Sequence, residues 1–148
     1  MISRYEHFSS VISGIYRCIQ KIERDEMEKY GYKGAFAQYL AAMKRYPEGL
    51  TSVQLTEICD RDKAAISRAV AEMEEKGLIE REGTAYRARL RLTEAGLRAA
   101  QFVCERAQSA VEAVSKDLTT SELDAVYASL SVIASNLEAV SKEGIPEN

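Results

Sequence analysis

Histidine is almost absent from this sequence, and no group of side chains has the spacing of a metal site. His7 is the only candidate for a catalytic imidazole, and serine or cysteine nucleophiles need such a base beside them. No His, Cys and Asp residues cluster at metal-ligand spacing, and no glycine-rich phosphate loop follows a strand. We therefore expect a protein without catalytic activity, cofactor or metal.

Cysteine is also scarce. Cys18, Cys59 and Cys104 are more than forty residues apart from one another. An odd number of cysteines without regular spacing argues against a disulfide framework. We expect reduced thiols that pack in helices as small hydrophobic side chains.

Long hydrophobic runs are missing as well. The longest unbroken apolar run covers only residues 39–43, far short of the roughly 20 residues that span a bilayer. The first seven residues lack the apolar core of a secretory signal. These features predict a cytoplasmic protein with no membrane partner.

The formal net charge of −3 is unfavourable for a nucleic-acid binder, but the charge is unevenly distributed. Residues 33–100 carry twelve basic and ten acidic side chains, whereas residues 101–148 carry three basic and eight acidic ones. A local basic surface can bind phosphate while an acidic remainder faces away from it. Nucleic-acid binding is therefore compatible with the overall acidity.

Helical periodicity dominates both ends of the chain. Apolar residues recur at three- and four-residue steps over residues 2–30, and a second helix is predicted over residues 35–45. A long helix is predicted from Glu94, with the stripe Leu97, Ala100, Cys104, Ala107, Val111 and Val114. A last helix after Thr119 has a coiled-coil seam formed by Leu123, Val126, Leu130, Ile133, Leu137 and Val140.

Two shorter helices separated by a tight turn lie in the middle of the chain. Thr51 and Gln54 fit a capping box for the first helix. Asp62 is a plausible N-cap for the second, which is predicted over residues 63–76 and ends at Gly77. The buried stripe of this second helix is predicted to be Ile66, Val70 and Met73.

After this helix the apolar residues alternate with polar ones, which is the pattern of β-strands and predicts a β-hairpin. Residues 78–82 and 86–93 are predicted strands, joined by a turn at 83–85. In the second strand Arg87, Arg89 and Arg91 share one face, and we expect Arg81 of the first strand to lie next to them. Because surface strands usually carry charges of mixed sign, such an arginine ribbon favours contact with nucleic acid.

The exposed face of the helix over residues 63–76 suits the major groove of DNA. Lysine and arginine can donate to phosphate or guanine, serine can bond to base or backbone, and alanine can contact a thymine methyl group. The residues on this face are Lys63, Ala64, Ser67 and Arg68. A solvated amphipathic helix would explain one pair of charges equally well, but the arginine ribbon favours DNA.

The sequence resembles the MarR family of bacterial regulators over nearly its whole length. The resemblance is carried by residues 50–79, including Ala65-Ile-Ser-Arg-Ala-Val70 and Met73-Glu-Glu-Lys-Gly-Leu-Ile79, and by Leu92-Thr-Glu-Ala-Gly96 after the wing. It implies a homodimer, built from the first and the last two helices, that binds double-stranded DNA at a pseudo-palindromic operator and is released by a small ligand or by oxidation. The wing departs from many relatives, since it lacks an aspartate two residues before an arginine near its tip.

The predicted fold is therefore mainly α with a small β-hairpin wing. Residues 33–93 form the winged helix-turn-helix DNA-binding domain, and residues 1–32 and 94–148 form a helical dimerisation region. The predicted DNA-contacting residues are Lys63, Ala64, Ser67, Arg68, Arg81, Arg87 and Arg89. We expect a transcriptional repressor.

Aromatic side chains are predicted where the dimerisation helices meet the DNA-binding domain. The candidate ligand-binding residues are Tyr16, Phe36, Tyr39 and Phe102. Plain core packing is an equally good explanation for each of them. The sequence does not identify an effector.

Two alternatives to a ligand-released DNA binder stay open. Cys18, with Arg17 and Lys21 nearby to stabilise a thiolate, is a candidate peroxide sensor. The acidic net charge favours a winged-helix module that binds a protein partner, whereas the basic faces favour DNA.

Overall fold

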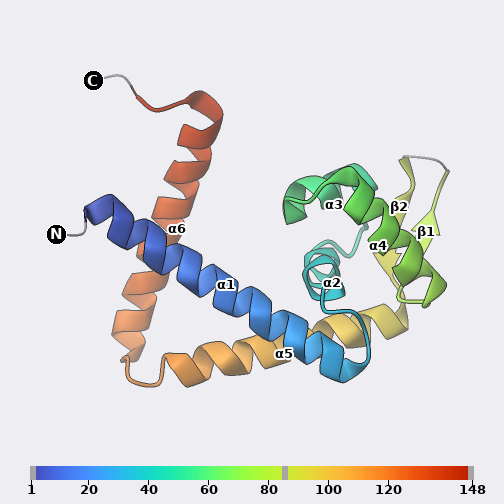
Figure 1. The fold of residues 1–148 in the computed structure, drawn as a ribbon, viewed down its shortest axis with the longest axis horizontal. Helices are drawn as coiled ribbons and strands as arrows, with labels where there is room; N and C mark the ends of the chain where they lie inside the picture. The colour runs from blue at the N-terminus through green and yellow to red at the C-terminus, as the bar shows by residue number, and fades with distance from the viewer. Residues whose placement is uncertain (1–2, 85–86, 147–148) are drawn as a thin grey trace. The chain divides into compact units, whose positions relative to one another are not determined.

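The computed structural model describes residues 3–84 and 87–146, which form helices and a two-stranded antiparallel sheet (Figure 1). The elements are α1 (Arg4–Tyr30), α2 (Phe36–Lys44), α3 (Ser52–Cys59), α4 (Lys63–Glu75), β1 (Ile79–Glu82), β2 (Arg89–Leu92), α5 (Glu94–Val114) and α6 (Thr120–Glu143). This composition confirms the predicted fold class. The chain divides by its internal contacts into two compact units, Met1–Ala110 and Val111–Asn148, whereas the division into DNA-binding and dimerisation regions stays a prediction.

Side-chain caps fix where most of the helices begin. Thr51 and Thr119 form the predicted capping boxes of α3 and α6, and Asp62 accepts a hydrogen bond from the Ala65 amide of α4 at 2.8 Å. Ser3 forms a further capping box at the start of α1. Each cap satisfies amide groups that a first helical turn leaves without partners.

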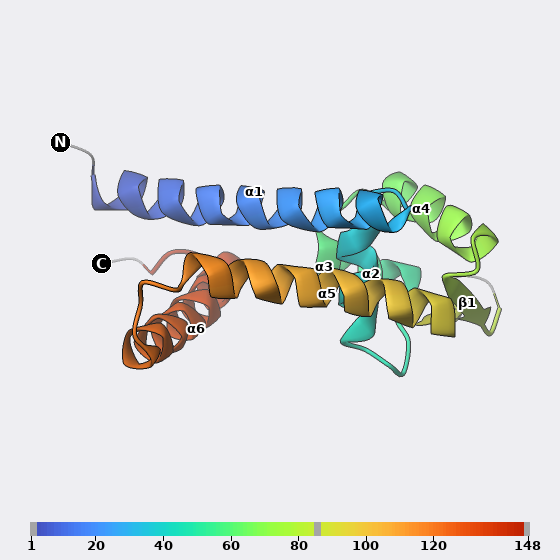
Figure 2. The same cartoon turned by 90° about the horizontal axis from the view of Figure 1, so that it is seen from below.

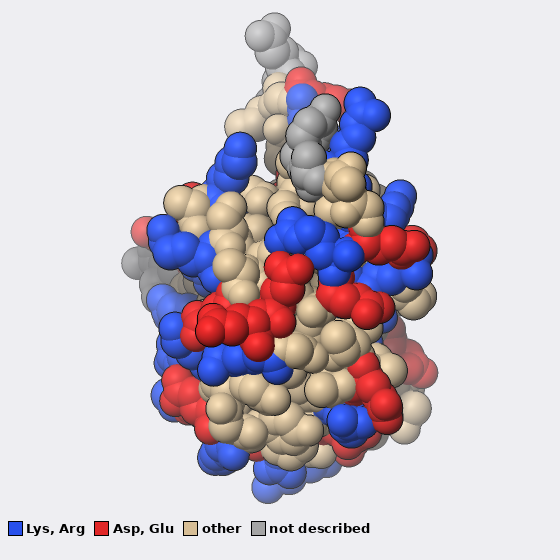
Figure 3. Space-filling view, turned by 90° about the vertical axis from the view of Figure 1, so that its right-hand side faces the viewer, with Lys and Arg blue, Asp and Glu red and all other residues tan. Residues whose placement is uncertain are grey.

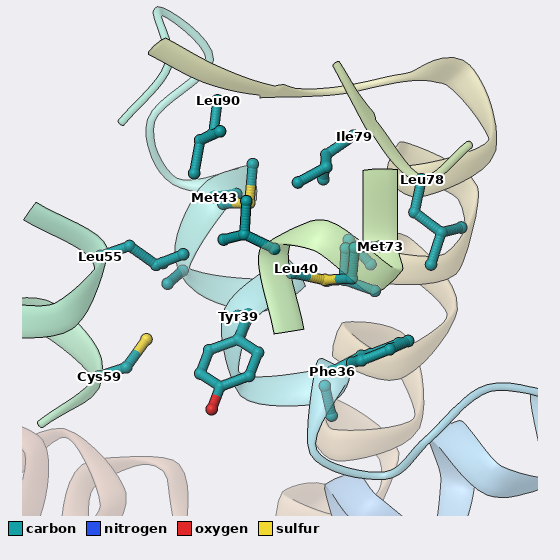
Figure 4. Close-up of a cluster of buried hydrophobic side chains, with 14 of the residues drawn as sticks. Phe36, Tyr39, Leu40, Met43, Leu55, Cys59, Met73, Leu78, Ile79 and Leu90 are labelled. Atoms are coloured by element: carbon teal, nitrogen blue, oxygen red, sulfur yellow. The ribbon is translucent and has the colours of Figure 1, made fainter. Parts of the chain in front are cut away.

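The hydrophobic core lies among α2, α3, α4, the wing and α5. Ile66, Val70 and Met73 of α4 are buried as predicted. Figure 4 shows side chains from α2, α3, α4 and both strands converging on this cluster. Because α4 is held by its buried stripe, its opposite face is presented to solvent.

Helix α5 buries only part of the predicted stripe: Ala100 is buried, whereas Leu97 and Val114 are exposed. Gly96, Ala99, Ala100 and Val103 face the core, whereas Leu97 is 45% exposed. The reason is close packing against the backbone of the chain before β1. A Cβ atom on Gly96 would lie 1.8 Å from the Leu78 carbonyl oxygen, so the smallest side chains of α5 mark the face that approaches the core.

The C-terminal half of α1 lies beside α5 (Figure 2). Arg106 Nε donates to Glu26 Oε2 at 2.9 Å, and the rings of Tyr30 and Phe102 are 4.7 Å apart between centroids. Within the described ranges, no helix combines the length and apolar composition needed to cross a bilayer.

Candidate nucleic-acid interface

Helix α4 presents the predicted reading face to solvent. Lys63, Ala64, Ser67 and Arg68 are all exposed on its N-terminal half. Neither Lys63 nor Arg68 forms an ion pair with any residue that the structure describes. Their positive charges are thus available to an external anion, on a helix whose other face is anchored in the core.

The opposite end of α4 has a different electrostatic character. Glu72 accepts an ion pair from Lys33 at 2.8 Å, and Glu74 pairs with Arg81 at 3.3 Å. Two of the three acidic residues of α4 are therefore engaged by neighbouring elements. Positive charge remains unpaired only towards the N-terminal half of the helix, as far as the described residues show.

The wing does not form the predicted arginine ribbon. In the register of β1 and β2, Arg81 is opposite Leu90 and Glu82 is opposite Arg89. Since directly opposed residues of an antiparallel pair share a face, Arg81 lies on the face away from Arg89 and Arg91. Glutamates share the face of the arginines instead, and the surface carries charges of both signs, as Figure 3 shows for the side of the molecule with α4 and the wing.

The wing arginines also have structural partners. Arg89 Nη1 donates to the Gly49 carbonyl oxygen at 3.1 Å, and Arg91 Nε donates to the Glu48 carbonyl oxygen at 3.2 Å. Arg91 additionally pairs with Glu82 at 3.1 Å. These bonds hold the wing against the segment that precedes α3, whether or not the same arginines also contact DNA.

The second strand is shorter than predicted. It covers Arg89–Leu92, and Arg87 lies before it as an exposed residue, while Ala88 is buried. Part of the predicted turn and strand, at residues 85 and 86, lies outside the described residues. The assignment of Arg87 to DNA contact stays a prediction.

The turn between α3 and α4 involves a residue that sequence reasoning missed. Gln38 of α2 donates from Nε2 to the Cys59 carbonyl oxygen at 3.1 Å, and its Oε1 accepts from Arg61 Nε at 3.4 Å. No sequence pattern signals these bonds, because they join residues that are 21 and 23 positions apart.

The four predicted ligand-binding aromatic residues do not line a common cavity. Phe36 is buried in the core, Tyr16 is 53% exposed, and Phe102 packs on Tyr30. Tyr39 alone among these four lines a cavity of about 310 Å³. The polar residues of that cavity include Gln20, Glu23, Arg24, Gln38 and Arg61.

Glu23 is an acidic residue of this cavity with a shifted pKa. Its side chain is half-buried on α1, and burial raises the pKa of its carboxyl above the ordinary glutamate value, with Arg45 opposing this effect. Arg24 and Arg61 supply positive charge in the same cavity. The cavity can therefore offer hydrogen-bond donors, acceptors and charges of both signs to a small molecule.

The three thiols are separate. Cys18 is exposed, Cys59 is buried and Cys104 is intermediate. Burial raises the pKa of the Cys59 thiol, as expected for a side chain that serves packing. Lys21, one of the two predicted cationic neighbours of Cys18, forms an ion pair with Asp25.

Comparison with known proteins gives a consistent result. Residues 30–90 match the sequence model described as the MarR family. No curated protein sequence matches the chain significantly. The matched segment contains α2, α3, α4, β1 and the start of β2.

Solved structures share the fold over nearly the whole chain. A MarR-family transcriptional regulator from Silicibacter pomeroyi is 20% identical, with 99% of this chain and 97% of that chain covered and a TM-score of 0.76. A putative MarR-family regulator from Listeria monocytogenes, complexed with a 26mer DNA, is 19% identical, with coverage of 100% and 99% and a TM-score of 0.76. MepR, a transcription regulator of the Staphylococcus aureus multidrug efflux pump MepA, is 19% identical, with coverage of 88% and 98% and a TM-score of 0.67.

The sequence match and the fold converge on one assignment. The matched segment includes the exposed face of α4 and most of the wing. The MarR-family structures that share this fold are described as transcription regulators. With the helix-turn-helix and the wing in the order that its sequence motifs indicate, residues 30–90 match the MarR family model, and the chain has the winged-helix fold of the MarR-family regulators.

Proposed function

We propose that the protein is a repressor that binds a pseudo-palindromic operator as a homodimer and is released by a small molecule. The observation that carries this proposal is the exposed N-terminal face of α4. Lys63 and Arg68 lie there without an ion-pair partner among the described residues, beside Ser67. A rigid helix with free donors at its N-terminal end suits base readout in the major groove.

Exposed apolar surface supports the homodimer. On α1, Phe8, Ile12, Ile15 and Ile19 are exposed at helical spacing. On α6, the seam residues Val126, Leu130, Ile133 and Leu137 are exposed as well. Long apolar stripes of this kind are unusual on a monomer and are typical of interaction surfaces.

The cavity beside Tyr39 supports release by a small molecule. Its lining joins α1 and α2 to Arg61 and Asp62, which lie immediately before α4. A bound molecule would contact the turn that leads into the reading helix. If the small molecule binds the DNA-free conformation more tightly than the DNA-bound one, it lowers the affinity of the protein for DNA.

Selection of duplexes from a random pool tests DNA recognition and symmetry together. We expect an inverted repeat whose half-sites lie about one helical turn apart, as two-fold related reading helices require. The selected operator, placed over a reporter promoter, should lower transcription when the protein is present. Enrichment of no sequence would contradict the proposed readout, and increased transcription would contradict repression.

Release is tested on the same complex by fluorescence anisotropy with a library of small organic molecules. A molecule that acts through the cavity should release the wild type but act weakly on Arg24→Ala, because Arg24 lines the cavity. Equal release of the wild type and Arg24→Ala would indicate that the effector binds outside this cavity.

A further inference from the structure

The side-chain amide of Gln38 connects helix α2 to both sides of the turn before the reading helix. Its Nε2 donates to the carbonyl oxygen of Cys59, the last residue of α3, at 3.1 Å. Its Oε1 accepts from Arg61 Nε at 3.4 Å. One half-buried side chain thus holds the end of α3 and the residue that precedes the N-cap of α4.

The turn itself needs such support. It consists of Asp60, Arg61 and Asp62, and Asp60 has a φ of 48°, the one positive φ among described residues other than glycine. A left-handed conformation in a non-glycine residue persists only where the surroundings determine it. In addition, the carbonyl groups of a last helical turn lack partners within the helix, and Gln38 provides a donor for the carbonyl of Cys59.

The geometry of this turn determines how α4 begins. Ile66, Val70 and Met73 hold the helix in the core from its second turn onwards. The first turn, with Lys63 and Ala64, is instead oriented by the turn and by the Asp62 cap. Base contacts tolerate displacements of only about 0.5 Å, so a small change at the turn would matter most for these first residues.

We propose that Gln38 is a positioning residue for sequence readout. It makes no contact with DNA, but it holds the α3–α4 turn so that the first turn of α4 meets the base edges in one orientation. This inference rests on the proposed function of α4 as the reading helix. It adds a residue of α2, outside the helix-turn-helix and the wing, to those that determine specificity.

The proposal makes a prediction that a general loss of stability does not. Phosphate contacts give affinity for any duplex, whereas base contacts require exact geometry. Loss of the Gln38 bonds should therefore lower affinity for the operator while affinity for a scrambled duplex and the salt dependence stay the same. A variant that is only less stable would contain less folded protein, so its apparent binding to both duplexes would weaken by the same factor.

The test compares Gln38→Met with Gln101→Met, using the operator selected with the wild type. Methionine keeps the length of the unbranched side chain and removes both hydrogen bonds, and Gln101 is exposed on α5. For Gln38→Met we expect about a tenfold loss of operator affinity, equivalent to one good base contact. Scrambled-duplex affinity should change by less than about twofold because phosphate contacts remain, and Gln101→Met should match the wild type on both duplexes.

Hydrogen exchange of the folded proteins gives a second readout, independent of DNA. Amides of residues 60–65 should exchange faster in Gln38→Met than in the wild type, with no such change in Gln101→Met. Unchanged operator affinity in Gln38→Met, or an equal loss on both duplexes, would overturn the proposal. If the wild type selected no sequence, the proposed function itself would fail, and this outcome is distinguishable from the other two.

Discussion

Arg68 and Arg81 show how differently two exposed guanidinium groups can be used. Arg81 pairs with Glu74 at 3.3 Å on the strand face opposite to that of Arg89, whereas Arg68 has no ion-pair partner among the described residues. Exposure alone therefore does not identify a DNA contact. The absence of an internal partner makes Arg68 the better candidate for base readout.

Replacing Arg68 with alanine tests this distinction. Arg68→Ala should cost about 1–3 kcal/mol of operator binding and relax the base preference at the contacted position, as loss of a base contact does. Arg98→Ala serves as the control, because Arg98 pairs with Glu94 on α5. Titration by fluorescence anisotropy measures both variants, and wild-type affinity in Arg68→Ala would rule out the contact.

Arg89 is expected to behave as a phosphate-binding residue. Arg89→Ala should weaken binding to all sequences alike and reduce the slope of the salt dependence by about one unit. Its bond to the Gly49 carbonyl means that thermal stability must be measured on the same sample. A fall in operator affinity with an unchanged salt slope would instead indicate that Arg89 acts by holding the wing.

Glu23 predicts a pH dependence of stability. Burial raises the pKa of its carboxyl in the folded chain, so the folded state binds more protons than the unfolded state in the window between the two pKa values. Stability therefore decreases as the pH rises from the unfolded value through the folded value. Glu23→Gln should be more stable than the wild type above this window, and the difference should shrink as the pH falls below it. Melting temperatures of both proteins measured across acidic and neutral pH check the sign.

Cys18 is expected to play no part in DNA release. Of its two predicted cationic neighbours, Arg17 and Lys21, the second forms an ion pair with Asp25. An organic hydroperoxide should leave operator binding unchanged in the wild type and in Cys18→Ser. Release of the wild type but not of Cys18→Ser would establish the redox alternative.

At the scale of elements, the close approach of α5 to the chain before β1 depends on Gly96. An added Cβ would lie 1.8 Å from the Leu78 carbonyl oxygen, and backbone cannot move as easily as a flexible side chain. Gly96→Ala should therefore lower the free energy of unfolding by about 1–3 kcal/mol, the typical cost of overpacking. Chemical denaturation measures the change. Gly14→Ala, where no atom lies within 4 Å of the added Cβ, should not be destabilised.

Local patterns predicted the helices and their caps well. Thr51, Asp62 and Thr119 were recognisable because a cap is a relation between residues three positions apart. The buried stripe of α4 followed from the same short spacing. These features depend on the nearest turns of the chain, so a single sequence contains the information.

Features that join distant segments could not be read in this way. The register of β1 and β2 placed Arg81 away from the other arginines, because a strand pattern defines alternation but not which faces of two strands coincide. The predicted stripe of α5 was right at Ala100 but wrong at Leu97, because Gly96 and Ala99 look less hydrophobic than Leu97 although their small size permits close packing. The bonds of Gln38 depend on a loop geometry that no periodicity encodes.

At the scale of the whole molecule, the exposed seam of α6 should determine the state of assembly. Leu130 is 38% exposed in the single chain and lies in the middle of the seam, whereas Val132 is 60% exposed and lies outside it. If the seam is covered by a second subunit, the buried carboxylate of Leu130→Glu would be strongly unfavourable there. We expect a wild-type dimer at micromolar concentration, a monomeric or unfolded Leu130→Glu, and a dimeric Val132→Glu, all measured by sedimentation velocity.

Because a two-fold operator needs two reading helices in one particle, a dissociated variant should also lose the cooperative occupation of both half-sites. A wild type that sediments as a stable monomer would remove the basis for a pseudo-palindromic operator, while leaving the reading face of α4 to be tested on a single half-site.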